Sequence, residues 1–225
     1  QGTNPSFGDL CDIVGDMDGD GRAEFVVSAT TEPNGTISHA GCVRVYSGAD
    51  AHELYTFRGS DQAGHLGAAV SAAGDVNADG FADLCVGAPD VNIAGMGRDV
   101  GTAQVISGRD GSVLYSFQGT RAIEFFGTAC ADVGDIDGDA HDDVLISATS
   151  AVAPNGRITG SLRIFSGADG HLLREIFGDL NGHRLGTSVS GAGDVDADGT
   201  LDVIAVQYDK VRVFSGRDGH ELWRR

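Results

Sequence analysis

Residues 15–24 read GDMDGDGRAE, and this short stretch decides both the fold and the chemistry expected of the chain. Its acidic positions are Asp16, Asp18, Asp20 and Glu24. Carboxylates this close together repel one another, so the spacing is sensible only if a hard cation lies among them. The same pattern, D-x-[DN]-x-D-[GA]-x-x-[DE], recurs three more times, at intervals of 59, 60 and 59 residues.

Calcium is the cation that this pattern favours. It takes roughly six to eight oxygen ligands in a flexible geometry, and side chains at positions 1, 3, 5 and 9 with a main-chain carbonyl at position 7 can supply them. No Cys or His side chain belongs to the set, which disfavours zinc and copper. The predicted ligands of about four Ca²⁺ ions, one per repeat, are Asp16, Asp18, Asp20, Arg22 and Glu24; Asp75, Asn77, Asp79, Phe81 and Asp83; Asp135, Asp137, Asp139, His141 and Asp143; and Asp194, Asp196, Asp198, Thr200 and Asp202.

The loops differ from an EF-hand at their ends. An EF-hand loop needs a glutamate at position 12, where this chain has Val27, Val86, Ile146 and Ala205. These residues are apolar and lie in predicted strands, so we expect strand-mounted loops. In the third loop Ala140 stands where the others have glycine. Because glycine tolerates the sharp bend, we expect the third site to be the most strained and the most easily left empty.

The acidic loops lie in phase with a longer repeat. Before each loop an aromatic residue or a leucine precedes a glycine; after it come a short apolar run, a strand ending in Ser-Gly and a last short strand. The glycines of the first motif are Gly8, Gly67, Gly127 and Gly186. Short apolar runs with period-two alternation, bounded by Gly, Asp and Ser, are typical of strands. Four short strands per repeat predict the blades of a β-propeller.

We therefore expect an all-β fold, a single β-propeller of four-stranded blades over residues 1–225. The expected repeats are roughly 1–58, 59–118, 119–177 and 178–225. Leu222–Arg225 aligns with an outer strand, and the pattern continues in register at Gln1 and Gly2. This continuity favours a closed ring of four blades, since closure removes exposed sheet edges. The alternative is a segment of a larger propeller of roughly seven or eight blades.

Long loops separate the second and third strands of the first three repeats. They cover residues 30–41, 89–101 and 149–160, whereas the fourth repeat has a tight turn near Tyr208 and Asp209. Long loops on one face of a rigid scaffold commonly carry binding function. We expect these loops to bind a protein or glycan partner.

Composition narrows the partners and the compartment. A net charge of −18 disfavours nucleic acid and anionic membrane surfaces, and it favours bound cations. No apolar run is long enough for a membrane helix, so membrane insertion is not expected. The cysteines, Cys11, Cys42, Cys85 and Cys130, do not fix a disulfide pattern, and Cys85 and Cys130 stand where other repeats carry Val or Leu. We expect a secreted, cell-surface or periplasmic protein.

The motifs together resemble a known family. The Phe-Gly or Leu-Gly pair, the acidic loop and the triplet Gly87-Ala88-Pro89 are similar to the FG-GAP repeats of integrin α-subunit propellers and their bacterial relatives. The resemblance implies a propeller with calcium loops between the first and second strands of each blade, on the face opposite the ligand-binding loops. It also implies adhesion or partner recognition. Integrin propellers have seven blades, whereas this sequence supplies four repeats.

Three functions remain open on the sequence. The favoured one is a non-catalytic extracellular adhesion or recognition module that calcium stiffens. A polysaccharide-acting enzyme would draw on His39, His65 or His183, but no recognisable catalytic order accompanies them. A sugar-binding protein would draw on exposed aromatic residues. Tyr55 and Trp223 align in the outer strand with Tyr115, which favours packing between blades.

Overall fold

The computed structural model describes residues 7–225, and every regular element in that range is a β-strand. Blade 1 contains β1 (Cys11–Gly15), β2 (Glu24–Ala29), β3 (Cys42–Tyr46) and β4 (Glu53–Arg58). Blade 2 contains β5 (Ala69–Gly74), β6 (Asp83–Ala88), β7 (Thr102–Ile106) and β8 (Val113–Gln118). Blade 3 contains β9 (Phe126–Asp132), β10 (Val144–Ala148), β11 (Ser161–Phe165) and β12 (Leu172–Phe177). Blade 4 contains β13 (Val189–Gly193), β14 (Asp202–Gln207), β15 (Lys210–Phe214) and β16 (Glu221–Arg224).

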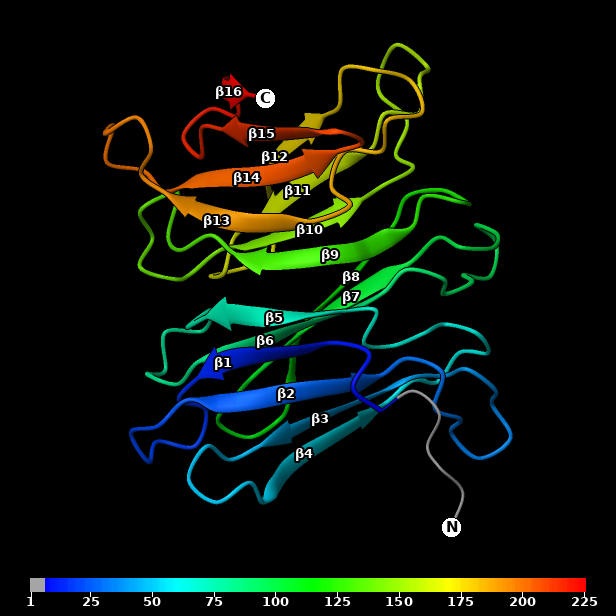
Figure 1. Ribbon diagram of the computed structural model, residues 1–225, viewed down its shortest axis with the longest axis vertical. Coiled ribbons are helices and arrows are strands. Elements are labelled where there is room, and N and C mark those ends of the chain that lie inside the picture. The colour runs from blue at the N-terminus through cyan, green and yellow to red at the C-terminus, as the bar shows by residue number, and fades with distance from the viewer. Residues whose placement is uncertain (1–6) are drawn as a thin grey trace.

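Each blade is a four-stranded antiparallel sheet in which every strand pairs with the next along the chain. Figure 1 shows the blades following one another along the long axis, from blade 1 at the bottom to blade 4 at the top. The predicted all-β propeller of four four-stranded blades is confirmed. No helix among residues 7–225 is long and apolar enough to span a membrane.

The hydrophobic core lies between the blades. Three buried clusters fill the three joints, and each draws side chains from two consecutive blades. At the first joint Met17 of blade 1 is fully buried against the Ser-Gly corner of blade 2. A Cβ at the corner residue Gly108 would lie 1.9 Å from the carbonyl oxygen of Ala82, so only glycine fits there. The repeated Ser-Gly of the sequence is therefore a packing requirement.

Blades 1 and 4, at the two ends of the row, expose apolar side chains whose counterparts in the inner blades are buried. Phe126, the aromatic residue that precedes the blade 3 glycine, is fully buried, whereas its counterpart Phe7 in blade 1 is 51% exposed. Ile13 on β1 and Val195 after β13 are also exposed, and β1 and β13 are not among the closely packed strand pairs of the described residues. The expected closure of the ring through packing of blade 4 on blade 1 is therefore not seen in this structure.

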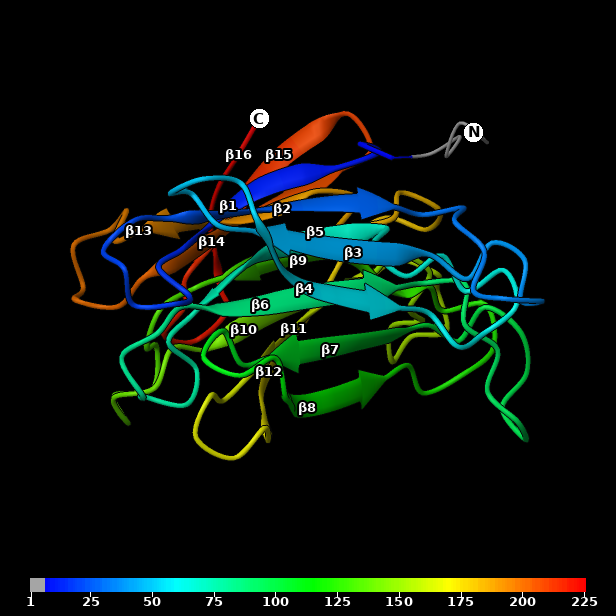
Figure 2. The same cartoon turned by 90° about the horizontal axis from the view of Figure 1, so that it is seen from below.

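The connecting loops separate onto two sides. In Figures 1 and 2 the loops between the first and second strands of each blade gather on one side, and the longer loops between the second and third strands gather on the other. In blade 4 the second of these connections is only the two-residue turn at Tyr208 and Asp209. This arrangement gives the long loops a face of their own, away from the acidic loops.

Candidate metal centre

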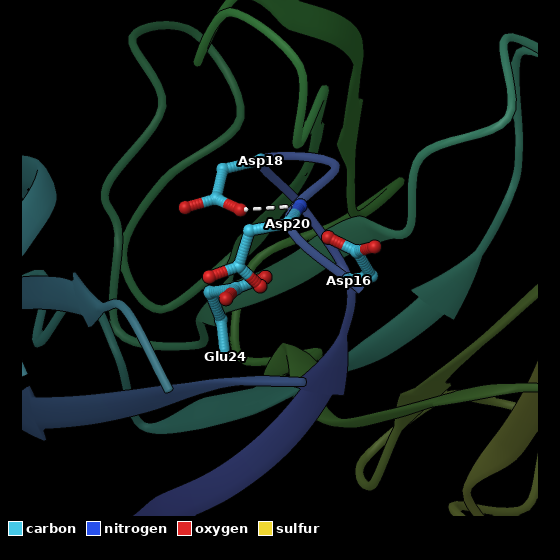
Figure 3. A group of neighbouring side chains, drawn as sticks. All are labelled: Asp16, Asp18, Asp20 and Glu24. Atoms are coloured by element: carbon cyan, nitrogen blue, oxygen red, sulfur yellow. Dashed lines mark hydrogen bonds between the residues drawn. The ribbon is translucent and has the colours of Figure 1, made fainter. Parts of the chain in front are cut away.

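The first acidic loop joins β1 to β2 and gathers its carboxylates. Oxygens of Asp16, Asp18, Asp20 and Glu24 all lie within 4.8 Å of one another. Figure 3 shows the four side chains converging from the turn and from the start of β2, with the amide of Asp20 donating to Asp18 over 3.0 Å. Four carboxylates at this separation could hold a hard cation.

The main chain of each loop holds its acids in place. The amide of the sixth residue donates to the first acid in all four loops, at 2.9, 2.8, 2.9 and 3.0 Å. The amide of the seventh residue donates to the fifth acid, at 2.9, 3.1, 2.9 and 2.8 Å. The donors of this second bond are Arg22, Phe81, His141 and Thr200. The repeated pattern shows that the loops share one backbone conformation set by their own residues.

Two positions in each loop require a left-handed backbone. The sixth residue has positive φ throughout, including Ala140 at 71°. The fourth residue has positive φ as well, and it is an alanine in two loops, Ala78 at 55° and Ala197 at 63°. Each of loops 2, 3 and 4 therefore carries one alanine in a conformation that costs a residue with a side chain on the order of 1 kcal/mol. The strain expected at Ala140 is real, but it does not single out the third loop.

The ninth acid of each loop is a buried bridge. Glu24, Asp83, Asp143 and Asp202 are all fully buried. One oxygen of Asp83 accepts the amide of Val76 in its own loop at 2.9 Å, and the other accepts the amide of Gly108 in the Ser-Gly corner at 3.0 Å. The same pair of bonds recurs in the other three blades. This residue ties the acidic loop to the Ser-Gly corner, which in blades 2 to 4 packs against the preceding blade.

Burial makes three of the bridging carboxylates, Glu24, Asp83 and Asp143, less acidic by raising the pKa of each. Removal from water raises the pKa of Asp83 to about 6, against the opposing effect of the amides of Gly108 and Val76. Burial likewise raises the pKa of Asp143 to about 6, and nearby acids of the same loop add to that shift. The pKa of Glu24 is also raised, chiefly by burial. A bound cation would reverse the destabilising effect of ionisation at these positions.

The four loops do not gather their acids equally. Loops 3 and 4 each bring together the first, third and ninth acids within 4.8 Å. The fifth acid of each of these loops is not part of the cluster and contacts another residue. Asp139 accepts a hydrogen bond from the Ser166 hydroxyl at 3.2 Å, and a carboxylate oxygen of Asp198 lies 3.8 Å from a guanidinium nitrogen of Arg217. In loop 2 the Asn77 amide nitrogen donates to Asp79 at 3.2 Å.

Sequence reasoning missed two features of these loops. The left-handed fourth position was signalled by Gly19 and Gly138, which stand there in loops 1 and 3. The bridge from the ninth acid to the Ser-Gly corner was signalled by the strict phase of the two motifs. The bond itself connects residues 24, 25, 24 and 14 positions apart, so only the folded blade shows it.

The histidines and the tryptophan considered for the alternative functions lie outside the acidic loops. His65 bonds Asp90 at 2.7 Å and its ring lies 5.9 Å from that of His39, while His183 packs on Tyr208 in blade 4. Of the three histidines predicted for an enzymatic alternative, His39 and His65 are therefore neighbours, whereas the ring contact of His183 is with Tyr208. Trp223 is half-exposed.

Packing explains two other groups of residues. The hydroxyls of Tyr55 and Tyr115 donate to the carbonyls of the next blade's Ser-Gly corner, at 2.9 and 2.8 Å, so both rings belong to the joints. All four cysteines are free, and Cys85 and Cys130 are buried as expected of small apolar residues.

The chain resembles known proteins along most of its length. The FG-GAP repeat family matches residues 66–106. Integrin alpha-5 of Xenopus laevis is 32% identical over 222 residues, which cover 91% of this chain and 20% of the integrin. Integrin alpha-V of Gallus gallus is 31% identical over 208 residues, covering 85% and 19%. Integrin alpha-IIb of Homo sapiens is 32% identical over 209 residues, covering 87% and 19%. The chain thus spans about a fifth of the length of these curated relatives.

Solved structures share the fold at lower identity. The rhamnogalacturonan lyase YesW matches with a TM-score of 0.57 and 17% identity, over 97% of this chain and 42% of the lyase. The exotype rhamnogalacturonan lyase YesX matches with a TM-score of 0.61 and 17% identity, over 97% and 40%. At this identity the likeness concerns the arrangement of blades alone.

Proposed function

This chain belongs to the FG-GAP repeat family, and on that premise we propose that it is a non-catalytic, calcium-binding recognition module of a secreted, cell-surface or periplasmic protein. The observation that carries the proposal is the convergence of acids in the loops between first and second strands. Backbone amides hold these acids in place before any ion arrives. The single domain of four repeats, residues 1–225, is the unit that we propose to act in recognition.

Calcium is the ion that fits the donor set best. The first loop offers four carboxylates, and loops 3 and 4 offer three each, all of them oxygen donors. We assign one Ca²⁺ to each loop, about four in total, with the carbonyls of the seventh residues completing the shell. Each ion would neutralise acids that a net charge of −18 makes mutually repulsive. Because the ninth acid also bonds the Ser-Gly corner, calcium would clamp the loop to the sheet.

Partner binding is assigned to the opposite side of the molecule. Loops 30–41, 89–101 and 149–160 leave the blades away from the acidic loops, which gives a partner access without competing with calcium. The integrin α-subunits that the chain resembles support a role in adhesion. We propose a protein or glycan ligand for this side.

The proposal of partner binding is tested with variants that the chain itself suggests. Each long loop is replaced in turn by the tight turn Tyr208-Asp209 of blade 4, and binding to immobilised extracellular-matrix proteins and glycans is measured with calcium or with chelator. At least one replacement should abolish binding while calcium uptake is kept. Binding that survives all three replacements together would overturn the assignment.

The absence of catalysis is tested separately. The purified chain is incubated with rhamnogalacturonan, because the solved structures that share its fold include lyases named for that polymer. We expect no unsaturated products by ultraviolet absorbance. Turnover that depends on His65 would show that the module is an enzyme.

A further inference from the structure

Three blades place an arginine at the middle of the third strand and neutralise it with nearby acids. Arg44 of β3 bonds Glu32 at 2.7 Å. Arg163 of β11 bonds Glu175 at 2.7 Å and also bonds Glu124. The third arginine, Arg212 of β15, bonds Glu221 at 2.5 Å and lies near Asp179.

Blade 2 lacks this charged network entirely. Gln104 occupies the arginine position, since it pairs with Ser116 in the register in which Arg163 pairs with Glu175. Ser116 therefore stands where blade 3 has Glu175, a position that Thr56 fills in blade 1. Gly64 stands where blade 3 has Glu124, because it lies two residues before Leu66 as Glu124 lies two residues before Phe126. Relative to blade 3, the arginine and both of its acidic partners are replaced by uncharged residues.

A cavity of about 300 Å³ opens at this place, between blades 1 and 2. The corresponding hollow beside blade 3 measures about 250 Å³ and is lined by the ionic network of Arg163. The side chains of Gln104, Ser116 and Asp61 line the cavity of blade 2, and none of them makes a side-chain hydrogen bond or ion pair within residues 7–225. Unpaired donors and acceptors on rigid strands are available to a ligand.

The wall also has an apolar part. Leu66, Val91 and Phe117 line the same cavity as the amide and hydroxyl groups. Arg58 reaches its rim but is held by Glu32 at 2.7 Å, so its charge is already compensated. The cavity thus combines neutral donors and acceptors, one carboxylate and an apolar surface.

We propose that this cavity binds a neutral saccharide of one or two rings. A sugar offers hydroxyls that both donate to and accept from Gln104 and Ser116, and its C–H face suits the apolar wall. Asp61 can accept two further hydroxyls, and it disfavours anionic ligands. The size lies at the lower end of small-molecule sites, roughly 300 to 1,000 Å³, which restricts the ligand to one or two rings. The proposal rests on the recognition role above and supplies it with a ligand class and a place.

The test uses the whole chain, saturated with calcium, and neutral sugars as probes. Glucose, galactose, mannose and rhamnose, and disaccharides of them, are titrated to about 50 mM while the main-chain amide resonances of the cavity residues Leu66 and Phe117, which every variant keeps, are followed by NMR. Galacturonate serves as the charged comparison. The variant Q104R/S116E rebuilds the ion pair of blade 3 and fills the cavity without removing a buried apolar group.

The matched control is T56A, since Thr56 is the blade 1 counterpart of Ser116 and lies outside the cavity. We expect at least one neutral sugar to saturate, with Q104R/S116E weakening it at least about tenfold and T56A changing it less than about twofold. A cooperative thermal unfolding transition of Q104R/S116E, measured by circular dichroism, shows that the variant is folded whether or not the chain takes up calcium.

Three results would overturn the saccharide assignment. They are no saturable shift with any neutral sugar, unchanged binding in Q104R/S116E, or tighter binding of galacturonate than of every neutral sugar. Calcium uptake measured on the same samples reports separately on the proposed function, so failure of one proposal is distinguishable from failure of the other.

Discussion

The acidic loops of blades 2 and 4 share a sequence pattern and a backbone conformation but differ in their surroundings. Val76, the second residue of loop 2, is fully buried because blade 3 packs on it, whereas its counterpart Val195 in loop 4 is 54% exposed. Yet in both loops the second residue's amide bonds the ninth acid and the sixth residue's amide bonds the first acid. The comparison teaches that the loop shape is local, while the stability of the loop depends on the neighbouring blade.

The largest effect is expected from breaking the bridge between loop and corner. Replacing Asp83 by Ala leaves the amides of Val76 and Gly108 buried without acceptors, which should cost about 3 kcal/mol of unfolding free energy. Chemical denaturation in chelator measures it. The control, Asp196→Ala, removes an exposed acid of loop 4 and should change the metal-free stability by less than about 0.5 kcal/mol. Equal losses would show that the ninth acid is no bridge.

The second prediction compares the same valine-to-alanine substitution at the packed joint between blades 2 and 3 and at the exposed end of blade 4. Val76→Ala should lower the unfolding free energy by about 2 kcal/mol, because it empties space between two packed blades. Val195→Ala should change it by less than about 0.5 kcal/mol, because that side chain contacts water. Similar losses at both sites would contradict the difference between an interior joint and an end face.

The raised pKa values of Asp83 and Asp143, both about 6, predict an unusual pH dependence. The folded state holds these protons more tightly than the unfolded chain does, so the metal-free protein should lose stability as pH rises from about 4 to 6, on the order of 1 kcal/mol per group. Urea titrations in chelator across this range check the sign. Asp83→Asn should flatten the slope, and an unchanged slope in that variant would exclude Asp83 as its source.

With calcium present the same groups should act in the opposite direction. Calcium requires ionised carboxylates, so the rise in melting temperature that calcium produces should shrink as pH falls from 7 to 5 through the pKa values of about 6. Differential scanning calorimetry at matched ionic strength measures it. A calcium effect as large at pH 5 as at pH 7 would mean that these acids do not take part in binding.

The smallest effect concerns the left-handed alanines. Ala78→Gly and Ala140→Gly should each stabilise the protein by roughly 0.5 kcal/mol, since glycine adopts positive φ without strain but gains unfolded-state entropy. Gly80→Ala, the reverse change in loop 2, should destabilise by about 1 kcal/mol. Melting temperatures of the three variants, each compared with that of the unaltered protein, measure these changes in stability. Stabilisation by the reverse change would contradict the assigned backbone.

Much of this structure could be predicted from the sequence because the motifs repeat in phase. The acids at alternating positions from Asp16 onward, and the apolar residue at position 12, predict a strand-mounted loop from local spacing alone. The bridge from Asp83 to Gly108 could not be predicted, since it joins two motifs across the sheet. The exposure of Phe7 and Val195 also escaped prediction, because register between the chain ends indicates a compatible ring without showing that the end blades pack.

The cavity of blade 2 illustrates a further limit. The sequence shows that Gln104 stands where other blades have an arginine. Whether this leaves an open cavity depends on which residues stand where blade 3 has the acidic partners of its arginine. Gly64 lies 40 residues before Gln104 and Ser116 lies 12 after it, so these three differences from blade 3 look unrelated until the strands are paired. Pairing in the sheet turns three scattered differences into one site.

Calcium binding is the central claim, and isothermal titration of chelator-treated protein at pH 7 tests it most directly. The account predicts uptake of about four Ca²⁺ ions at micromolar to millimolar affinity, a higher melting temperature with calcium, and a loss of one ion in the paired substitution Asp16→Asn with Asp18→Asn. Replacing the exposed Asp209 of blade 4 by Asn should leave the stoichiometry unchanged. A chain that takes up no calcium, and melts at the same temperature with calcium or chelator, would contradict the account.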